Sequence, residues 1–156
     1  MKAVVVPATE AHARAIAANV READRIELWA ASRADPLAAM LQGMKSTSEP
    51  LTAIYDGEPA AMFGVWPYSV LSGMGAAWMI GSNVLNRHGA QRELLRISAP
   101  VVEYWGEQFP SLLYNFVDAR NTSAIRWLRW LGFKFGDPIP YGVDRLPFIP
   151  FFRSED

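Results

Sequence analysis

Residues 112–135 constrain the fold of this chain more than any other stretch, because they predict a strand, a helix and a second strand joined by short turns. Residues 112–117 are apolar or aromatic apart from Asn115, which is typical of a strand buried on both faces. Asn121 follows a short turn and is a residue type that caps helix N-termini. Gly132 stands where a left-handed residue commonly ends a helix. Between these two signals apolar residues recur at helical spacing, at Ala124, Ile125, Leu128 and Leu131.

Three further helices are predicted from apolar spacing and from end signals. Thr9 is a good N-cap for the first of them, and Pro36 suits the first position of the second. Pro100 lies inside the third, where it must kink the helix or begin a new segment. The predicted ranges are 9–20, with a pattern that continues to 30 across a boundary near 22, then 37–44 and 92–105.

Strands are predicted where apolar residues alternate or run together. Asp56-Gly57 is a strong signal for a hairpin turn. Pro147 and Pro150 favour an edge strand, where a missing N–H is best tolerated. The predicted strands are 3–7, 51–55, 60–66, 75–81, 133–135 and, at the edge, 147–152. With the helices they predict one mixed α/β domain over residues 1–156, with helices on both faces of a central sheet.

Two short motifs resemble those of a known fold. Asn121-x-x-Ala124, followed by Leu131-Gly132-Phe133, resembles the closing motif of the GNAT acyltransferase fold. The resemblance implies a mostly antiparallel central sheet in which two central strands, here 75–81 and 112–117, splay apart. It also implies that acetyl-CoA fills the gap between them and that an amine is the acyl acceptor.

A second set of residues resembles the tail-end signature of the internal virion protein A family of short-tailed phages, a GNAT-like offshoot. It consists of Tyr114-Asn115-Phe116-Val117, Asn121, Ile125-Arg126-Trp127-Leu128 and Gly132, and the resemblance is best over residues 78–152. It implies a protein of the virion interior or the host cytoplasm, with other virion proteins as partners. Two hypotheses therefore stand: an acetyl-CoA-dependent N-acyltransferase with a degenerate site, and a non-catalytic virion or assembly protein that retains the fold.

Residues 86–91 predict a coenzyme-binding loop, because they lie where a helix N-terminus and its free N–H groups favour a pyrophosphate. The family loop has Gln or Arg, two residues, Gly, one residue, and Gly or Ala; this chain has Asn86, Gly89 and Gln91 at those positions. An ordinary solvated loop is the alternative. By the same resemblance Asn121 would contact the pantetheine arm, which is compatible with its role as a cap. The predicted cofactor-binding residues are Met79, Gly81, Arg87, His88, Gly89, Ala90, Gln91 and Asn121.

No catalytic residue is assigned from the sequence. The family usually places a tyrosine where this chain has Leu128, which cannot donate a proton. Residues 75–81 contain no carboxylate and no histidine that could act as a general base. Asp118 and Glu58 look like turn residues, and His88 looks like a solvated loop residue. The sequence therefore predicts the binding scaffold and not the proton-transfer groups.

The composition argues against several other kinds of site. The chain has no cysteine, which removes disulfides, thiolate catalysis and cysteine-ligated zinc, and His12 and His88 are too isolated to predict a metal site. A net charge of −1 predicts no nucleic-acid binding. Residues 59–86 are uncharged, but their internal Pro and Gly favour two buried strands over a membrane span. The arginines and tryptophans of residues 126–130 are interpreted as helix packing, with a partner contact or an oligomer as the alternative.

Overall fold

The computed structural model describes residues 2–69 and 71–154, which form an eight-stranded sheet with the order β1-β2-β3-β4-β5-β8-β6. β7 pairs with another part of β8. β4 and β5 run parallel, and the other neighbouring strands are antiparallel, so the predicted mixed, mostly antiparallel sheet is confirmed. The strands are β1 (Ala3–Pro7), β2 (Leu51–Tyr55), β3 (Glu58–Pro67), β4 (Met74–Gly81), β5 (Leu112–Asp118), β6 (Lys134–Phe135), β7 (Ile139–Tyr141) and β8 (Leu146–Arg153).

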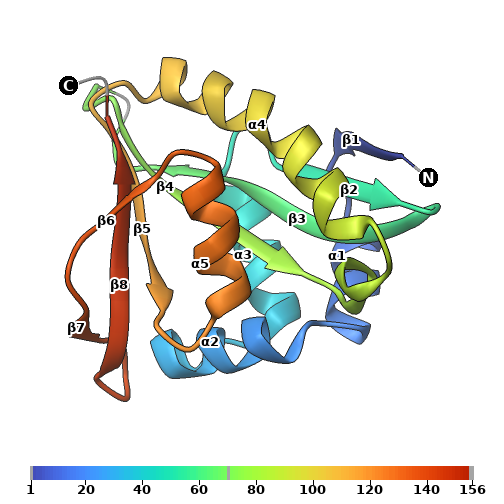
Figure 1. Ribbon diagram of the computed structural model, residues 1–156, viewed down its shortest axis with the longest axis horizontal. Helices are drawn as coiled ribbons and strands as arrows, with labels where there is room; N and C mark the ends of the chain where they lie inside the picture. Colours follow the sequence, from blue (N-terminus) through green and yellow to red (C-terminus); the bar gives the residue numbers. More distant parts are fainter. Residues whose placement is uncertain (1, 70, 155–156) are drawn as a thin grey trace.

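Helices cover both faces of the sheet, as predicted: α4 and α5 lie on one face and α1 and α3 on the other (Figure 1). α2 runs across one end of the sheet, next to the end of β5. A large apolar cluster that includes Phe63 and Leu113 packs under α4 and α5, and a smaller one around Ile16 and Met62 packs under α1 and α3. The helices are α1 (Glu10–Ala18), α2 (Glu22–Ser32), α3 (Pro36–Ser46), the short 3-10 helix η1 (Asn83–Asn86), α4 (Ala90–Gln108) and α5 (Thr122–Trp130).

The end signals of the sequence take the predicted conformations. Thr9 Oγ1 accepts a hydrogen bond from the backbone N–H of His12 at 3.1 Å, and Asn121 Oδ1 accepts one from Ala124 at 3.4 Å. Gly132, which follows α5, has a φ of +91°, a backbone conformation that favours glycine. Both capped helices therefore begin where their first free N–H groups find a side-chain acceptor.

Three helices precede the first hairpin, whereas the sequence predicted two. Residues 19–21 leave the helical path because they pair with the chain just after β4. Val20 forms a β-bridge with Ser82, and the N–H of Arg21 donates to the carbonyl of Gly81 at 2.9 Å. The helical pattern is therefore divided into α1 and α2 by a tertiary contact that local periodicity does not contain.

β8 is an interior strand, and the prediction that residues 147–152 form an edge strand is wrong. It pairs with β5 on one side and with β6 and β7 on the other. The carbonyl of Pro147 accepts from Ala119, beyond the end of β5, and that of Pro150 accepts from Gly136, between β6 and β7. In an antiparallel strand the N and the carbonyl O of one residue point to the same side. The nitrogens of Pro147 and Pro150 therefore also face residues outside the paired strands, where no strand carbonyl is left without a donor.

α4 is longer than predicted and continues through Pro100. It begins at Ala90 instead of residue 92, and η1 occupies part of the predicted loop. Pro100 lies on the exposed side of the helix, as does Arg96, whose carbonyl loses its helical partner. Water can bond that carbonyl, so the helix tolerates the proline.

The central strands β4 and β5 part after three residue pairs, which confirms the predicted splay. They pair at Met74–Leu112, Gly75–Leu113 and Ala76–Tyr114 and then diverge, leaving residues 77–81 and 115–118 on either side of a gap. We call this gap the fork.

Asn115 closes the narrow end of the fork. Its Nδ2 donates to the carbonyl of Ala77 on β4 at 2.8 Å, and its Oδ1 accepts from the N–H of Phe116 on β5 at 2.8 Å. One amide side chain thus supplies both partners that the separating strands no longer give each other.

We expect Asn115→Ala to lower the free energy of unfolding by about 1–3 kcal/mol, because it leaves a partly buried carbonyl and amide without partners. Urea denaturation measures the loss. Asn86→Ala, at the exposed last position of η1, is the control and should stay within about 0.5 kcal/mol of the wild type. An Asn115→Ala variant as stable as this control would refute the role of Asn115.

Candidate functional site

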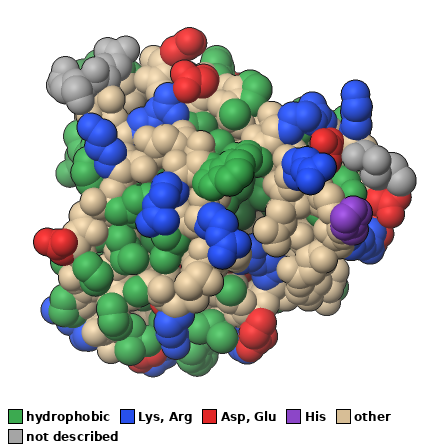
Figure 2. All heavy atoms as spheres, in the orientation of Figure 1, with side chains coloured by type: hydrophobic (Ala, Val, Ile, Leu, Met, Phe, Trp, Pro, Cys, Tyr) green, Lys and Arg blue, Asp and Glu red, His purple; other side chains and the backbone are tan. Residues whose placement is uncertain are grey.

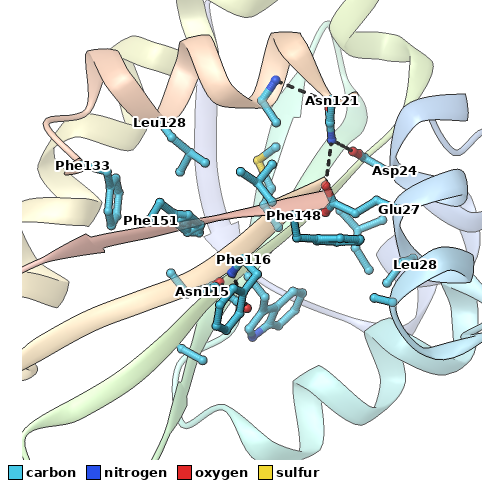
Figure 3. A pocket seen from close by; sticks show the side chains of 18 of the residues that line it. Asp24, Glu27, Leu28, Asn115, Phe116, Asn121, Leu128, Phe133, Phe148 and Phe151 are labelled. Atoms are coloured by element: carbon cyan, nitrogen blue, oxygen red, sulfur yellow. Dashed lines mark hydrogen bonds between the residues drawn. The ribbon is translucent and has the colours of Figure 1, made fainter. Parts of the chain in front are cut away.

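A cavity of about 270 Å³ occupies the fork. Its lining comes from β4 and β5 and from α2, α3, α4 and α5, so the cavity reaches from one face of the sheet to the other. The lining is mainly apolar and aromatic; the charged side chains among the described lining residues are Asp24 and Glu27. Figure 3 shows Leu128, Phe133 and Phe151 on the side of α5, and Leu28 and Phe116 on the side of α2.

Asp24 and Glu27 hold the wide end of the fork. The N–H of Gly81, the last residue of β4, donates to Asp24 Oδ2 at 2.7 Å, and the N–H of Asp118, the last residue of β5, donates to Glu27 Oε1 at 2.9 Å. Asn121 Nδ2 donates to both carboxylates, at 3.3 Å each (Figure 3). Each splayed strand therefore ends on a carboxylate of α2, and Asn121 links the two.

Two arginines balance part of this negative charge. Arg21 lies 3.6 Å from Asp24 Oδ1, and Arg120 pairs with Asp118 at 2.7 Å. Glu27 forms no ion pair with the residues that the structure describes. Burial raises the pKa of Glu27 to about 7, and the charges of Asp24 and Asp118 add to the rise, while hydrogen bonds from Asp118 and Asn121 oppose it. Burial also raises the pKa of Asp24, opposed chiefly by Arg21. Glu27 can therefore exchange a proton near neutral pH.

A backbone amide of β4 faces the fork between its two closed ends. The carbonyl of Ala77 accepts from Asn115 and the N–H of Gly81 donates to Asp24, so both point away from β3. Alternation along the strand puts the backbone of Met79 on the same side. Its N–H can therefore donate to a carbonyl oxygen bound in the cavity, which the Met79 side chain also lines.

The indole of Trp127 offers a second donor. Trp127 lines the cavity, and its buried Nε1 has no hydrogen-bond partner among the described residues. A buried indole N–H normally finds an acceptor. Its lack of one here fits a site in which a ligand supplies the acceptor.

The loop before α4 forms a separate hollow at the helix N-terminus. Gly89 is the N-cap residue and has a φ of +79°, a conformation that favours glycine. The hydroxyl of Tyr55 donates to the carbonyl of His88 at 2.8 Å, which fixes the loop against β2. The first turn of α4 leaves backbone N–H groups without helical acceptors, and such groups favour an anion. The hollow is lined by Leu85, Asn86, Arg87, His88, Gly89, Gln91 and Arg92.

Basic side chains surround the outer mouth of the fork. Figure 2 shows Lys and Arg side chains gathered around a hydrophobic hollow between α4 and α5. Arg92 on α4 and Arg126 and Arg129 on α5 are exposed, and none of the three forms an ion pair with another described residue. This face therefore attracts a polyanion, although the net charge of the chain is only −1.

Solved structures match this arrangement over nearly the whole chain, although no family model and no curated protein matches it. A ribosomal-protein-alanine N-acetyltransferase from Brucella melitensis has a TM-score of 0.68 at 18% identity, over 96% of this chain and 97% of that one. A GNAT superfamily phosphinothricin acetyltransferase from Sinorhizobium meliloti, in complex with AcCoA, has a TM-score of 0.71 at 14% identity, over 98% and 88%. An N-acetyltransferase from Staphylococcus aureus Mu50 has a TM-score of 0.69 at 15% identity, over 100% of both chains.

The chain has the GNAT fold. The resemblance seen in residues 121–133 is therefore confirmed at the level of the fold. Nothing in the comparisons links the chain to the internal virion protein A family.

Most of the predicted cofactor-binding residues line either the fork cavity or the hollow at the loop before α4. Met79 and Asn121 line the fork cavity, whereas Ala90 is buried beside the loop. Gly81 lies between the two groups, with its N–H bonded to Asp24. The loop hollow is lined by the remaining four, Arg87, His88, Gly89 and Gln91.

Two of the predicted residues are already engaged with other parts of the protein. Arg87 pairs with Glu58 at 2.6 Å, so its charge is partly balanced. The amide of Asn121 contacts Asp24, Glu27 and Arg21, in addition to capping α5. The roles of the predicted residues toward a coenzyme remain predictions.

Sequence reasoning missed Asp24 and Glu27. Their spacing of three residues places both on one side of α2, and this was the available signal. The spacing could not predict the site, because the backbone donors to these carboxylates lie far away in the sequence. Gly81 is 57 residues from Asp24, and Asp118 is 91 residues from Glu27. Asp118 was interpreted as a turn residue, but it is the buried last residue of β5.

Neither a membrane-spanning helix nor a metal-binding cluster is found in the described part of the chain. No helix in residues 2–69 and 71–154 combines the length and the apolar character needed to cross a bilayer. The same residues contain no group of three or more His, Asp or Glu side chains that could hold a metal ion.

We expect Glu27→Gln to stabilise the protein more at pH 8 than at pH 5. The raised pKa means that folded Glu27 binds its proton more tightly than the unfolded chain does, so wild-type stability falls as the pH rises from about 4.5 to about 7. Glutamine removes that loss, which amounts to about 1–3 kcal/mol. Chemical denaturation at both pH values measures it. Equal pH dependence in Glu27→Gln and in the exposed control Glu107→Gln would contradict a buried, proton-binding Glu27.

We expect Leu128→Tyr to lower stability by less than about 1.5 kcal/mol, because Leu128 borders a cavity that can accept the larger ring. Leu113→Tyr is the matched control, since Leu113 is 0% exposed in the same apolar cluster but does not line the cavity. Overpacking there should lower stability by about 3 kcal/mol or more. Equal losses in thermal denaturation would show that position 128 is closed core.

Proposed function

We propose that this protein is an acetyl-CoA-dependent N-acyltransferase with an amine as acceptor. One observation carries the proposal: the fork leaves a cavity through the sheet, and a carboxylate with a pKa near 7 stands at its wide end. The amine of the acceptor would lose its proton to Glu27 at that end. Glu27 would thus provide the general base, because β4 itself contains no carboxylate and no histidine.

The residues present fit an acyl-coenzyme A. The N–H of Met79 and the unpartnered Nε1 of Trp127 are donors suited to its carbonyl groups. The first turn of α4, after Gly89, is suited to its pyrophosphate. Arg92 of α4 and Arg126 of α5 are exposed and add positive charge on the face of the sheet that these two helices cover. Gln91 stands where the related loops have a small residue, and it is exposed, so its side chain can turn outward.

The proposed chemistry needs two proton transfers if the amine enters as an ammonium ion. A bound acetyl-CoA supplies a thioester whose C–S bond breaks as the C–N bond to the amine forms. Glu27 takes the first proton from the ammonium, and the second proton leaves the nitrogen and ends on the coenzyme sulfur. The N–H of Met79 is placed to stabilise negative charge on the acyl oxygen. Leu128 takes no part in proton transfer.

A second candidate function is favoured by Leu128, a buried leucine at the position of the usual tyrosine. A non-catalytic internal virion or assembly protein would use the fork only as a scaffold. Such a protein would lie in the virion interior or the host cytoplasm and contact other virion proteins. Detection of the protein in purified virions by mass spectrometry, without acylation of any amine, would favour this function.

We expect Glu27→Gln to lower kcat/KM for amine acylation about 10²–10⁴-fold. The wild type should gain activity as the pH rises through about 7, because Glu27 must be deprotonated to accept a proton, and the variant should lack this acid limb. The measurement is release of free coenzyme A with a panel of amines between pH 5.5 and 9. The control is Glu22→Gln, an exposed residue on the same helix, which should keep the wild-type profile.

Binding of the coenzyme is measured separately by thermal denaturation. Acetyl-CoA at a hundred times its Kd should add about 2.7 kcal/mol to the stability of both the wild type and Glu27→Gln. No stabilisation at millimolar acetyl-CoA would sink the proposal. An unchanged rate and pH profile in Glu27→Gln would remove Glu27 as the base.

A further inference from the structure

The half of the fork cavity under α2 and α3, which we call the acceptor side, is lined by aromatic rings. Phe116 of β5 stacks on Tyr141 of β7, with ring centroids 4.3 Å apart. Tyr141 also packs against Phe148 of β8, at 5.1 Å between centroids. All three rings line the cavity, and Phe148 is only 1% exposed. They form a fixed apolar wall on which a flat, apolar group can pack.

Trp78 lines the acceptor side from β4, the other strand of the fork. Its Nε1 donates to Thr47 Oγ1 at 2.9 Å, which satisfies its polar atom outside the cavity. The ring lies so close to Gly43 of α3 that an added Cβ there would come within 2.8 Å of it. The indole is thus held in one position, with its apolar surface available to the cavity.

When it is ionised, Glu27 carries a negative charge that no Arg or Lys side chain of the described residues pairs with. The cluster around it holds Asp24 and Asp118, which pair with Arg21 and Arg120 respectively. When all of these groups are ionised, one negative charge, that of Glu27, has no cationic partner in the cluster. A cationic group on a ligand would supply that partner, since a charge withdrawn from much of the solvent is stabilised by an opposite charge beside it.

The turn between β7 and β8 closes the acceptor side against the end of α2. The N–H of Val143 donates to the carbonyl of Ala31 at 3.1 Å, and Arg33 forms an ion pair with Asp144. At Gly142 an added Cβ would lie 2.7 Å from the Cα of Ala31, so the two segments are in direct contact. An extended polypeptide cannot pass between them unless this contact opens.

We infer that the acceptor is a small primary amine attached to an aromatic or otherwise apolar body, and not the N-terminus of a polypeptide. The amine nitrogen lies at Glu27 and the body packs between Trp78 and the Phe116–Tyr141 pair. This inference rests on the proposed function for its chemistry, but it concerns binding and can be measured without turnover.

The experiment compares three probes with the whole protein in the presence of acetyl-CoA: 2-phenylethylamine, 1,4-diaminobutane and a tetrapeptide that begins with alanine. We expect kcat/KM for 2-phenylethylamine to exceed the values for the other two by at least tenfold. Phe116→Ala should weaken binding of 2-phenylethylamine, measured by calorimetry, by at least tenfold and leave the Kd for acetyl-CoA unchanged. Trp130→Ala, at a position 68% exposed on α5, is the control and should change neither constant.

Each outcome separates the two proposals. Binding of 2-phenylethylamine that Phe116→Ala weakens, without acylation of any probe, supports the inferred site and rejects the acyltransferase function. Preferred acylation of the diamine or the peptide supports the function and overturns the inferred acceptor. No binding of 2-phenylethylamine also overturns it. If Phe116→Ala does not fold, Phe116→Leu, which keeps apolar volume but removes the ring, replaces it with the same expected direction.

Discussion

The structure depends on how the chain satisfies the backbone of two β-strands that separate in the middle of a sheet. Backbone N–H and C=O groups that lose their partners must find others if they are buried. Asn115 provides them at the narrow end of the fork, and the carboxylates of Asp24 and Glu27 provide them at the wide end. The separation is thus a defined feature with assigned partners at both ends. Between these ends the N–H of Met79 is left for a ligand, which is how a stable sheet can contain a slot.

The same groups that complete the sheet give the slot its chemistry. Asp24 is buried and Glu27 is partly buried where they accept from the strand ends, and desolvation is the main cause that raises the pKa of Glu27 to about 7. A carboxylate used only for structure would be more favourable with a cation beside it, as Asp118 has in Arg120. Glu27 lacks such a cation among the described residues, and this arrangement exchanges some stability for a group that can take up a proton.

Local signals in the sequence predicted much of the fold. The caps at Thr9 and Asn121, the Asp56-Gly57 turn and Gly132 work within a few residues, and all four were predicted correctly. The splay was predicted from the resemblance of residues 121–133 to a known fold, and not from periodicity.

The errors arose where distant segments decide the outcome. Pro147 and Pro150 suggested an edge strand because a proline has no N–H to give to a neighbouring strand. They fit inside the sheet because they face Ala119 and Gly136, which lie outside the paired strands, and only the tertiary structure places those two residues there. The carboxylates of α2, Asp24 and Glu27, were not singled out from the sequence for the same reason. Composition could not show that the last residues of β4 and β5 would meet them.

The wide end of the fork also bears on the order in which the protein folds. Its hydrogen bonds join residues separated by 57 positions for Asp24 and Gly81, 91 for Glu27 and Asp118, and 100 for Arg21 and Asn121. Contacts of such long range form slowly, because the intervening loops must close before the contact can stabilise the chain. Before β5 and α5 join the sheet, Asp24 and Glu27 are ordinary hydrated acids on a helix. The wide end of the fork is therefore a late product of folding, and a chain still emerging from the ribosome cannot complete it until β5 (Leu112–Asp118) and α5 (Thr122–Trp130) have been made.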